Sequence, residues 1–313
     1  MKVLITGGAG FIGSHIVEEL FDSHYEVVVV DNLVTGNLNN LPPQVCIYRQ
    51  DVRKDVDDIF TKEKPDYVIH QAAQVSVSHS FTDPLYDCEE NILATLNILQ
   101  ACAKHKVKKV VFASSAAVYG NPVYLPIDEA HNVRPISFYG LTKAHAEKYI
   151  QLFADTHNLD YSILRYANVY GPRQDARGEA GVIALFIEKL IRGESPVIFG
   201  DGKQTRDFIF VKDVARANVA ALSNGKNEIM NIGTGREVSI HEIIEQLAIS
   251  LGKPIQPILR PAREGDIRSS VLQNEQAQSM LHWSPCYSLK EGLLETVQFY
   301  QQENPYGFQE VTS

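Results

Sequence analysis

Short runs rich in valine and isoleucine alternate along the first half of this chain with longer amphipathic stretches. Each run is four to seven residues long, a length typical of buried strands. The runs are Val3–Thr6, Glu26–Asp31, Val45–Arg49, Tyr67–His70, Val110–Ser114 and Tyr161–Tyr166. The stretches between them include Ser14–Ser23, Leu93–His105 and Ser137–His157. Because alternating strands and helices join through right-handed crossovers, the pattern predicts an α/β fold with a doubly wound parallel sheet.

The alternation changes after about Gly171, where a glycine-rich segment precedes the apolar stretch Val182–Arg192. Further helix is expected near Ile240–Leu251. We therefore predict a first domain over residues 1–170 and a second, smaller α/β domain over residues 171–313. The segment Arg206–Asp213 is strand-like, and we expect it to return to the first sheet, which would complete the first domain near residues 206–213.

The composition excludes several classes of function. A net charge of −9 argues against nonspecific nucleic-acid binding, which needs a basic surface. No stretch approaches the ~18 apolar residues of a membrane span, and the start of the chain lacks the features of a signal peptide. The four cysteines have no metal-ligand spacing, so we expect reduced thiols in a cytoplasmic protein and no metal site.

The segment Thr6–Gly13 carries glycines at positions 7, 10 and 13, directly after the first strand and before a helical stretch. Such a turn lets backbone N–H groups approach a pyrophosphate at the start of the helix, so it predicts a dinucleotide site. Asp31 ends the second strand, where an acid would bond the adenine ribose. Its carboxylate would repel a 2′-phosphate, which favours NAD over NADP. Asp51 and Val52 either flank the adenine ring or simply end a strand.

Tyr139 and Lys143 are four residues apart on a predicted helix, so their side chains share one face. An ammonium beside a phenol stabilises the phenolate, and we expect it to lower the pKa of Tyr139 toward working pH. Tyr139 is therefore a candidate general base. Ser115 closes a strand at the edge where doubly wound folds place catalytic groups, and could share the substrate hydroxyl. Its alternative role is to cap its own backbone.

These residues resemble the extended short-chain dehydrogenase/reductase family, particularly its UDP-hexose 4-epimerases. The segments that carry the resemblance are TGGAGFIGSH (6–15), SSAAVYG (114–120), YGLTK (139–143), LRYANVYGPRQ (164–174), RDFIFVKD (206–213) and REGD (263–266). The resemblance implies a Rossmann domain that holds NAD tightly, a C-terminal domain that grips UDP, and a homodimer. It implies that Tyr166 lies against the nicotinamide.

The same resemblance places the substrate. Asn168 would hold the diphosphate, Arg206 and Arg263 would pair with the phosphates, Asp266 would bind the uridine ribose, and Val182 and Phe199 would line the uracil pocket. The predicted substrate contacts are Ser78, Ser115, Tyr139, Asn168, Val182, Phe199, Arg206, Arg263, Asp266 and Ser270. The predicted cofactor contacts are Gly7, Gly10, Phe11, Ile12, Gly13, Asp31, Asn32, Thr35, Gly36, Asp51, Val52, Gln71, Ala72, Ala73, Gln74, Asn91, Tyr139, Lys143 and Tyr166.

The implied activity is a UDP-hexose 4-epimerase that interconverts UDP-glucose and UDP-galactose through a transient 4-keto sugar. The small Ser270, four residues after Asp266, would leave room for N-acetylated sugars. Alternatives are a UDP-glucuronate 4-epimerase, a sugar 4,6-dehydratase and an inactive NAD-binding scaffold. A dehydratase needs an acid after the strand-end serines, where this chain has Ala116 and Ala117. The chain also departs from relatives at Ala117, often a hydroxyl residue, and at Val75, lysine in some epimerases.

Overall fold

A seven-stranded parallel sheet forms the centre of the protein. The computed structural model describes residues 1–175, 181–262 and 267–303. The strand order is β11-β6-β5-β4-β1-β2-β3. Their bounds are β1 Lys2–Thr6, β2 Glu26–Asp31, β3 Cys46–Arg49, β4 Tyr67–His70, β5 Lys109–Ser115, β6 Asp160–Tyr166 and β11 Glu228–Ile232. Most of these strands are buried on both faces, which explains their continuous runs of valine and isoleucine.

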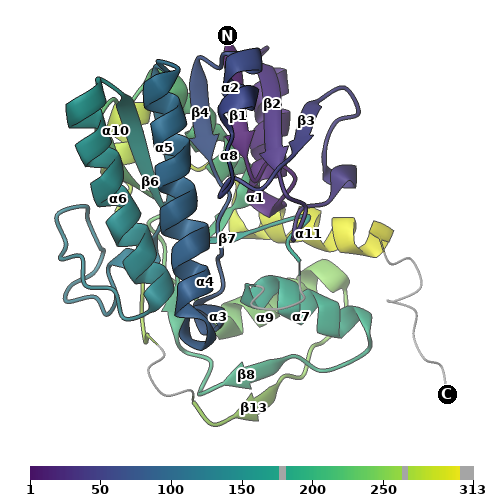
Figure 1. Ribbon diagram of the computed structural model, residues 1–313. Helices are drawn as coiled ribbons and strands as arrows, with labels where there is room; N and C mark the ends of the chain where they lie inside the picture. The colour runs from purple at the N-terminus through teal and green to yellow at the C-terminus, as the bar shows by residue number, and fades with distance from the viewer. Residues whose placement is uncertain (176–180, 263–266, 304–313) are drawn as a thin grey trace.

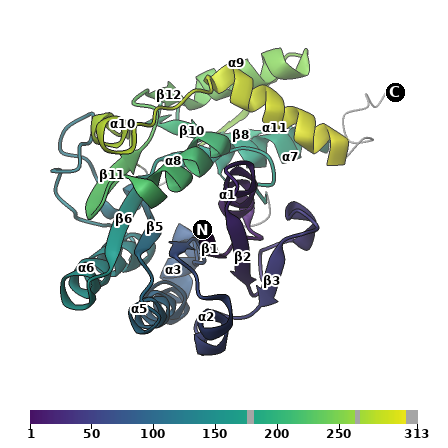
Figure 2. The same ribbon diagram turned by 90° about the horizontal axis from the view of Figure 1, so that it is seen from above.

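Helices cover both faces of this sheet (Figures 1 and 2). α1 (Phe11–Asp22) and α8 (Val211–Ser223) pack on one face around a core that contains Ile16, Leu20 and Val214. α2 (Asp57–Glu63), α5 (Ala94–Lys104) and α6 (Phe138–His157) cover the other. The strand ends Thr6, Asp31, His70, Ser115 and Tyr166 therefore share the carboxyl edge, where ligands bind in such folds.

The connection from β4 to α5 is helical for most of its length. It contains α3 (Val77–Thr82), α4 (Pro84–Cys88) and a π-helical turn η2 (Glu89–Leu93). Asp83 caps α4 by accepting a 3.0 Å hydrogen bond from the Tyr86 N–H, and Pro84 suits the first helical position. Two 3₁₀ turns, η1 (Leu38–Asn40) and η3 (Ala116–Val118), follow β2 and β5.

A second group of elements lies below the carboxyl edge in Figure 1 and has its own core. Its strands pair as β7 (Asn168–Tyr170) with β10 (Phe208–Phe210), β8 (Val197–Phe199) with β13 (Ile258–Arg260), and β9 (Thr205–Arg206) with β12 (Val238–Ser239). Its helices are α7 (Val182–Ile191), α9 (Ile240–Leu251) and α11 (Leu289–Glu303). α10 (Glu275–Leu281) packs against β11 and α8.

The chain returns to the main sheet at a different place from the one we expected. The prediction that residues 206–213 form a strand of that sheet was wrong. Arg206 ends β9, Phe208–Phe210 pair with β7, and Val211 begins α8. The three buried residues of β10 have the apolar pattern of a sheet strand but find their partner in β7, and β11 supplies the seventh strand beside β6.

Candidate active site

The loop between β1 and α1 accommodates only glycine at two positions. Gly7 has a φ of +68°, and a Cβ there would lie 2.7 Å from the Ala72 nitrogen. A Cβ on Gly13 would overlap the Gly7 carbonyl oxygen. Within the described residues no side chain caps α1 at Gly10, and the first turn carries no acid. The N–H groups at the start of α1 are therefore available to a phosphate group.

Asp31 lies beside this loop at the end of β2. The residue is 6% exposed, and its carboxylate accepts hydrogen bonds from the Ala9 N–H (3.0 Å) and the Leu33 N–H (2.8 Å). A Cβ on Gly36 would lie 2.7 Å from the Asp31 Oδ1, so glycine keeps this side of the carboxylate open. The prediction from the sequence that Asp31 lies next to the glycine loop is therefore confirmed. Of its predicted neighbours, Asn32 is partly buried and Thr35 is exposed.

The end of β4 passes close to the glycine loop. The Ala72 N–H donates to the Thr6 hydroxyl at 3.2 Å, which fixes the backbone next to Gly7. Gln71 donates from Nε2 to the Tyr166 hydroxyl at 2.9 Å, and Tyr166 in turn donates to Asn218 Oδ1 at 2.9 Å. Asn218, fully buried on α8, had no signal in the sequence. Asn218 thus links Tyr166, which we predicted to lie against the nicotinamide, to α8.

The remaining predicted cofactor residues are Phe11, Ile12, Asp51, Val52, Ala73, Gln74 and Asn91. Phe11 and Ile12 open α1, and Ala73 follows Ala72. Asp51 is held by Arg53, whose Nε lies 3.1 Å from each carboxylate oxygen, and Val52 is buried in the core. Gln74 and Asn91 bond to each other through backbone and side chain, at 3.0 and 3.1 Å. The contact of all these residues with a cofactor stays a prediction.

Ser115 and Tyr139 are brought together by the start of α6. Ser137 caps this helix by accepting a 3.0 Å bond from the Gly140 N–H. A Cβ on Gly140 would lie 2.5 Å from the Ala117 carbonyl oxygen, so glycine allows α6 to approach η3 closely. As a result Tyr139, in the first turn of α6, forms a hydrogen bond with Ser115, whose Oγ also accepts from the Ala117 N–H at 3.2 Å.

Lys143 lies one turn further along α6 and is 3% exposed. Its Nζ donates to the Ala113 carbonyl at 2.9 Å and lies 6.0 Å from the centre of the Tyr139 ring. Burial lowers the pKa of Lys143 to about 8, an effect that the charges of Asp87 and Glu147 oppose. The triad predicted from sequence, Ser115, Tyr139 and Lys143, therefore converges at one edge of the sheet.

The pKa of Tyr139 differs from our expectation. Burial raises it to about 12, and the hydrogen bond with Ser115 opposes this rise. The expected lowering of this pKa by the neighbouring ammonium was wrong for the protein alone, because the loss of hydration on burial is the largest influence on the phenol. The buried ammonium nevertheless remains protonated at neutral pH, since its pKa of about 8 lies above neutrality. A positive charge thus stays next to the phenol.

Several of the predicted substrate residues lie in or beside the second group of elements. Arg206 in β9 and Ser270 meet at Thr205: Arg206 donates to the Thr205 carbonyl at 2.8 Å, and so does the Ser270 N–H at 3.3 Å. Asn168 is exposed and begins β7, and Val182 begins α7. Phe199 ends β8, and Ser78 is exposed on α3. Arg263 and Asp266 lie outside the described residues.

Asp207 supports this region and was not assigned a role from sequence. It is 1% exposed and accepts hydrogen bonds from Thr234 (N–H 2.8 Å, hydroxyl 2.6 Å), Gly235 (3.1 Å) and Leu272 (3.3 Å). These bonds tie the chain next to Arg206 to the chain next to Ser270. The only signal was its place in the RDFIF run, because a buried structural acid has no pattern of its own.

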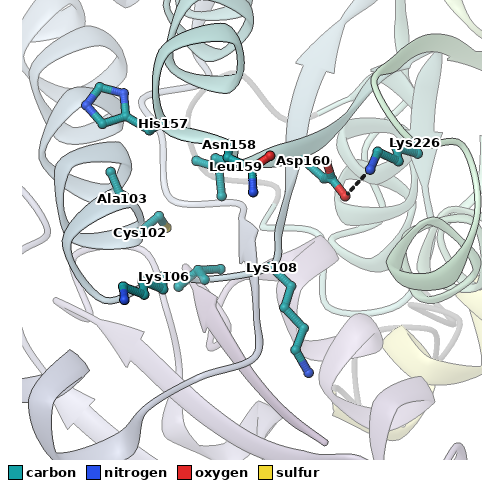
Figure 3. Close-up of a pocket in the computed structure, with 10 residues that line it drawn as sticks. Cys102, Ala103, Lys106, Lys108, His157, Asn158, Leu159, Asp160 and Lys226 are labelled. Carbon is teal, nitrogen blue, oxygen red and sulfur yellow. Dashed lines mark ion pairs between the residues drawn. The ribbon is translucent and has the colours of Figure 1, made fainter.

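A pocket of about 520 Å³ lies at the opposite, amino edge of the sheet (Figure 3). Lys106, Lys108 and Lys226 line it, and Lys226 pairs with Asp160 at 3.0 Å. It is remote from the glycine loop and Tyr139, so it is not part of the candidate active site. No helix in the described ranges is long and apolar enough to cross a membrane, and none of the described residues form a group suited to a metal ion.

A comparison of the sequence with known protein families agrees with the geometry of this site. The sequence model of the NAD dependent epimerase/dehydratase family matches residues 3–233. The chain belongs to this family. The matched region contains the glycine loop, Asp31 and the group formed by Ser115, Tyr139 and Lys143.

Individual members of the epimerase/dehydratase family are similar over nearly the whole chain. A Methanocaldococcus jannaschii protein, provisionally named a UDP-glucose 4-epimerase, is 48% identical over 96% of this chain and 99% of its own length. The Thermotoga maritima UDP-glucose 4-epimerase, solved with UDP-glucose, is 44% identical with a TM-score of 0.94, covering 97% and 99%. The Thermus thermophilus UDP-glucose 4-epimerase, solved with NAD, is 41% identical with a TM-score of 0.90, covering 96% and 99%.

The residues of this chain fit the dinucleotide that the family name implies. Gly7 and Gly13 leave space that a Cβ would fill, and α1 begins with N–H groups that no acid competes for in the described chain. Asp31 presents a buried carboxylate beside them, and no cation pairs with it among the described residues. NAD is therefore the cofactor of this protein, and Asp31 is suited to its ribose.

Proposed function

We propose that this protein is a UDP-hexose 4-epimerase that interconverts UDP-glucose and UDP-galactose with the help of tightly held NAD. One observation carries the proposal: Ser115, Tyr139 and Lys143 converge at the carboxyl edge that also holds the glycine loop. Relatives that are similar to this chain over nearly their full length are named for that reaction.

The residues have distinct tasks in the proposed reaction. Tyr139 takes the proton from the 4-hydroxyl group of the sugar, and Ser115 holds the same hydroxyl. Lys143 supplies a positive charge on the same helix face, which favours the phenolate as the proton leaves. When bound, NAD would supply the acceptor for the C4 hydride and the donor that returns it, so no external redox partner would be consumed.

Epimerisation further requires that the 4-keto sugar turns over before the hydride returns to its other face. The protein must hold UDP firmly and the sugar loosely. We assign the tight binding of UDP to Asn168, Arg206 and Arg263. The two arginines suit this role because guanidinium groups bind phosphate oxygens in pairs. Val182 and Phe199 would contact the uracil ring, and Asp266 the ribose.

Dehydration is the disfavoured alternative. A 4,6-dehydratase needs an acid directly after the strand-end serines to help expel water. Those positions are Ala116 and Ala117, which form the 3₁₀ turn η3 and carry no proton to donate. The structure therefore supports epimerisation over dehydration at this site.

We also propose a homodimer that works in the cytoplasm. Leu141, Tyr149 and Leu152 are exposed on one face of α6, which packs beside α5. A second copy of the chain would bury these side chains. Light scattering at working concentration tests the dimer. The cytoplasmic setting is supported by four cysteines that are all free thiols.

The decisive experiment is an assay of the purified protein with UDP-glucose. UDP-galactose is the expected product, and denaturation of protein purified without added nucleotide should release NAD. Accumulation of a 4-keto sugar would indicate the dehydratase. Absence of turnover in NAD-containing protein would overturn the proposed activity.

A further inference from the structure

Asp87 on α4 is a fully buried carboxylate next to the catalytic helix. It has no exposed surface. Three donors contact it: Gln74 Nε2 at 2.7 Å, Asn91 Nδ2 at 3.2 Å and the Thr142 hydroxyl at 2.8 Å. Since every polar contact is a donor, the site is built for the ionised carboxylate, which can only accept.

Thr142 joins this carboxylate to the catalytic pair. It lies between Tyr139 and Lys143 in the first turns of α6, and its hydroxyl is within 3.0 Å of the Tyr139 carbonyl. Its hydrogen bond to Asp87 therefore anchors the part of α6 that carries both catalytic groups. Asn91, in the π-helical turn η2, completes the anchor by also donating to the Thr142 hydroxyl at 3.1 Å.

Asp87 lacks the partner that a buried charge usually has. It forms no ion pair with any described residue, whereas Glu147, the other buried acid near Lys143, is bound by Arg165. Lys143 likewise has no acid within ion-pair distance in the described chain, and its one hydrogen bond goes to the Ala113 carbonyl. A buried anion and a buried cation thus lie near each other without touching.

Each charge affects the other. The negative charge of Asp87 opposes the fall in the pKa of Lys143 that burial causes, and Lys143 opposes the rise in the pKa of Asp87. Asp87 also raises the pKa of Tyr139. Without its partner, either buried charge would be costly.

We propose that Asp87 is a positioning residue for the catalytic pair: through Thr142 it anchors the first turns of α6, and its buried negative charge balances the Lys143 ammonium. This role rests on the proposed epimerase function, since it acts on the groups that function uses. Nothing in the spacing of the sequence indicates it, because Asp87 lies on a different helix from Tyr139 and Lys143.

Other titratable groups face the same site and must be considered. Glu147 acts on Lys143 from α6, and Tyr139 itself raises the pKa of Tyr166 on β6. His70 on β4 is buried, and its pKa is lowered to about 3 by burial and by the Lys143 charge, so it stays neutral. His79 on α3 acts weakly on Asp87. Asp87 is therefore the negative charge near Lys143 that no described cation already pairs with.

Replacing Asp87 by asparagine tests the charge, because the side chain keeps its volume and can still accept from Thr142. Loss of the charge should move both limbs of the pH profile of kcat/KM toward lower pH, since the pKa values of Lys143 and Tyr139 both fall. We expect kcat at neutral pH to drop on the order of 10- to 100-fold because Lys143 loses its balancing charge, with the affinity for UDP unchanged. A drop in kcat with both limbs in place would overturn the charge role.

Thr142→Val is the matched control for the anchor. It removes the hydroxyl but keeps the shape of the side chain and the Asp87 charge. We expect a lower kcat and an unmoved pH profile. Wild-type kcat in this variant would overturn the anchor, even if Asp87→Asn failed to fold.

A second readout does not depend on turnover. The ultraviolet absorbance of tyrosinate is titrated in NAD-loaded protein, with the signal of the matching Tyr139→Phe variant subtracted. Ionisation of Tyr139 should begin at lower pH in Asp87→Asn than in the wild type, and coincident titrations would overturn the proposal. If the wild type does not epimerise UDP-glucose, the proposed function fails, while this titration still decides the role of Asp87.

Discussion

Glu147 and Arg165 form a buried, two-pronged ion pair one turn beyond Lys143 on the catalytic helix. The Arg165 Nε lies 2.9 Å from one carboxylate oxygen of Glu147 and a terminal nitrogen 2.6 Å from the other. The Ser114 hydroxyl donates to the same carboxylate at 2.6 Å. The pair therefore joins α6, β5 and β6 directly behind the catalytic edge.

Breaking this pair should be costly. Glu147→Gln leaves a buried guanidinium without its counter-charge, and we expect a loss of about 3–5 kcal/mol in the free energy of unfolding, measured in urea. Glu26→Gln is the control, because Glu26 pairs with Lys2 at the surface and should cost less than about 1 kcal/mol. Similar losses in the two variants would contradict the structural role of the buried pair.

Tyr139→Phe should lower kcat by ~10²–10⁴, the usual contribution of a general acid–base group. The affinity for UDP, measured by calorimetry, should stay the same because Arg206 and the other residues proposed to contact the phosphates are intact. Bound NAD should also be retained. Turnover at the wild-type rate would mean that a different residue takes the proton.

Asp31→Ala should weaken NAD binding by about 10- to 100-fold, which corresponds to the loss of hydrogen bonds to a charged group. Discrimination against NADP should relax, because the carboxylate that repels the 2′-phosphate is gone. Asp31→Asn separates the two effects, since it keeps the volume and removes only the charge. An unchanged preference for NAD in both variants would show that Asp31 is not at the ribose.

His70 should contribute to stability in a defined pH window. It is buried between the Thr6 hydroxyl (2.6 Å) and the Thr95 hydroxyl (3.1 Å), and its pKa falls from 6.5 to about 3. The unfolded chain therefore binds more protons than the folded one between these values. The contribution is fully present above pH 6.5 and is lost as the pH falls toward 3.

The test of His70 compares the wild type with His70→Gln. Between about pH 5 and pH 4, the wild-type free energy of unfolding should fall by up to about 1.4 kcal/mol more than that of the variant. Urea denaturation at the two pH values gives the difference. Parallel losses would mean that His70 does not remain neutral in the folded protein.

Ser270 should permit sugars that carry a group at C2. In the resembling epimerases a bulky tyrosine at this position restricts the pocket, whereas serine leaves room for an N-acetyl group. We expect the wild type to epimerise UDP-N-acetylglucosamine as well as UDP-glucose, and Ser270→Tyr to lose only the former. The measurement is kcat/KM for both substrates in both proteins. A Tyr variant that keeps both activities would show that Ser270 does not control the pocket.

The sequence was sufficient to predict the local elements and which residues meet at the carboxyl edge. The six predicted strands form within one residue of their expected ends, because short runs rich in valine and isoleucine favour the strands of a parallel sheet. The glycine loop, Asp31 and the Tyr139–Lys143 spacing could also be identified, since each depends on residues close together in the chain. Such short-range constraints leave a pattern that can be recognised without coordinates.

Only the tertiary structure decided which distant segments pair and which buried charges meet. The segment 206–213 has the apolar pattern of a strand, but that pattern does not specify a partner, and β7 rather than the main sheet provides it. Likewise Asp87 and Thr142 are 55 residues apart, and the pKa of Tyr139 rises because surrounding elements remove its water. Pairing, burial and charge balance depend on neighbours brought in by folding, so the order of residues alone does not reveal them.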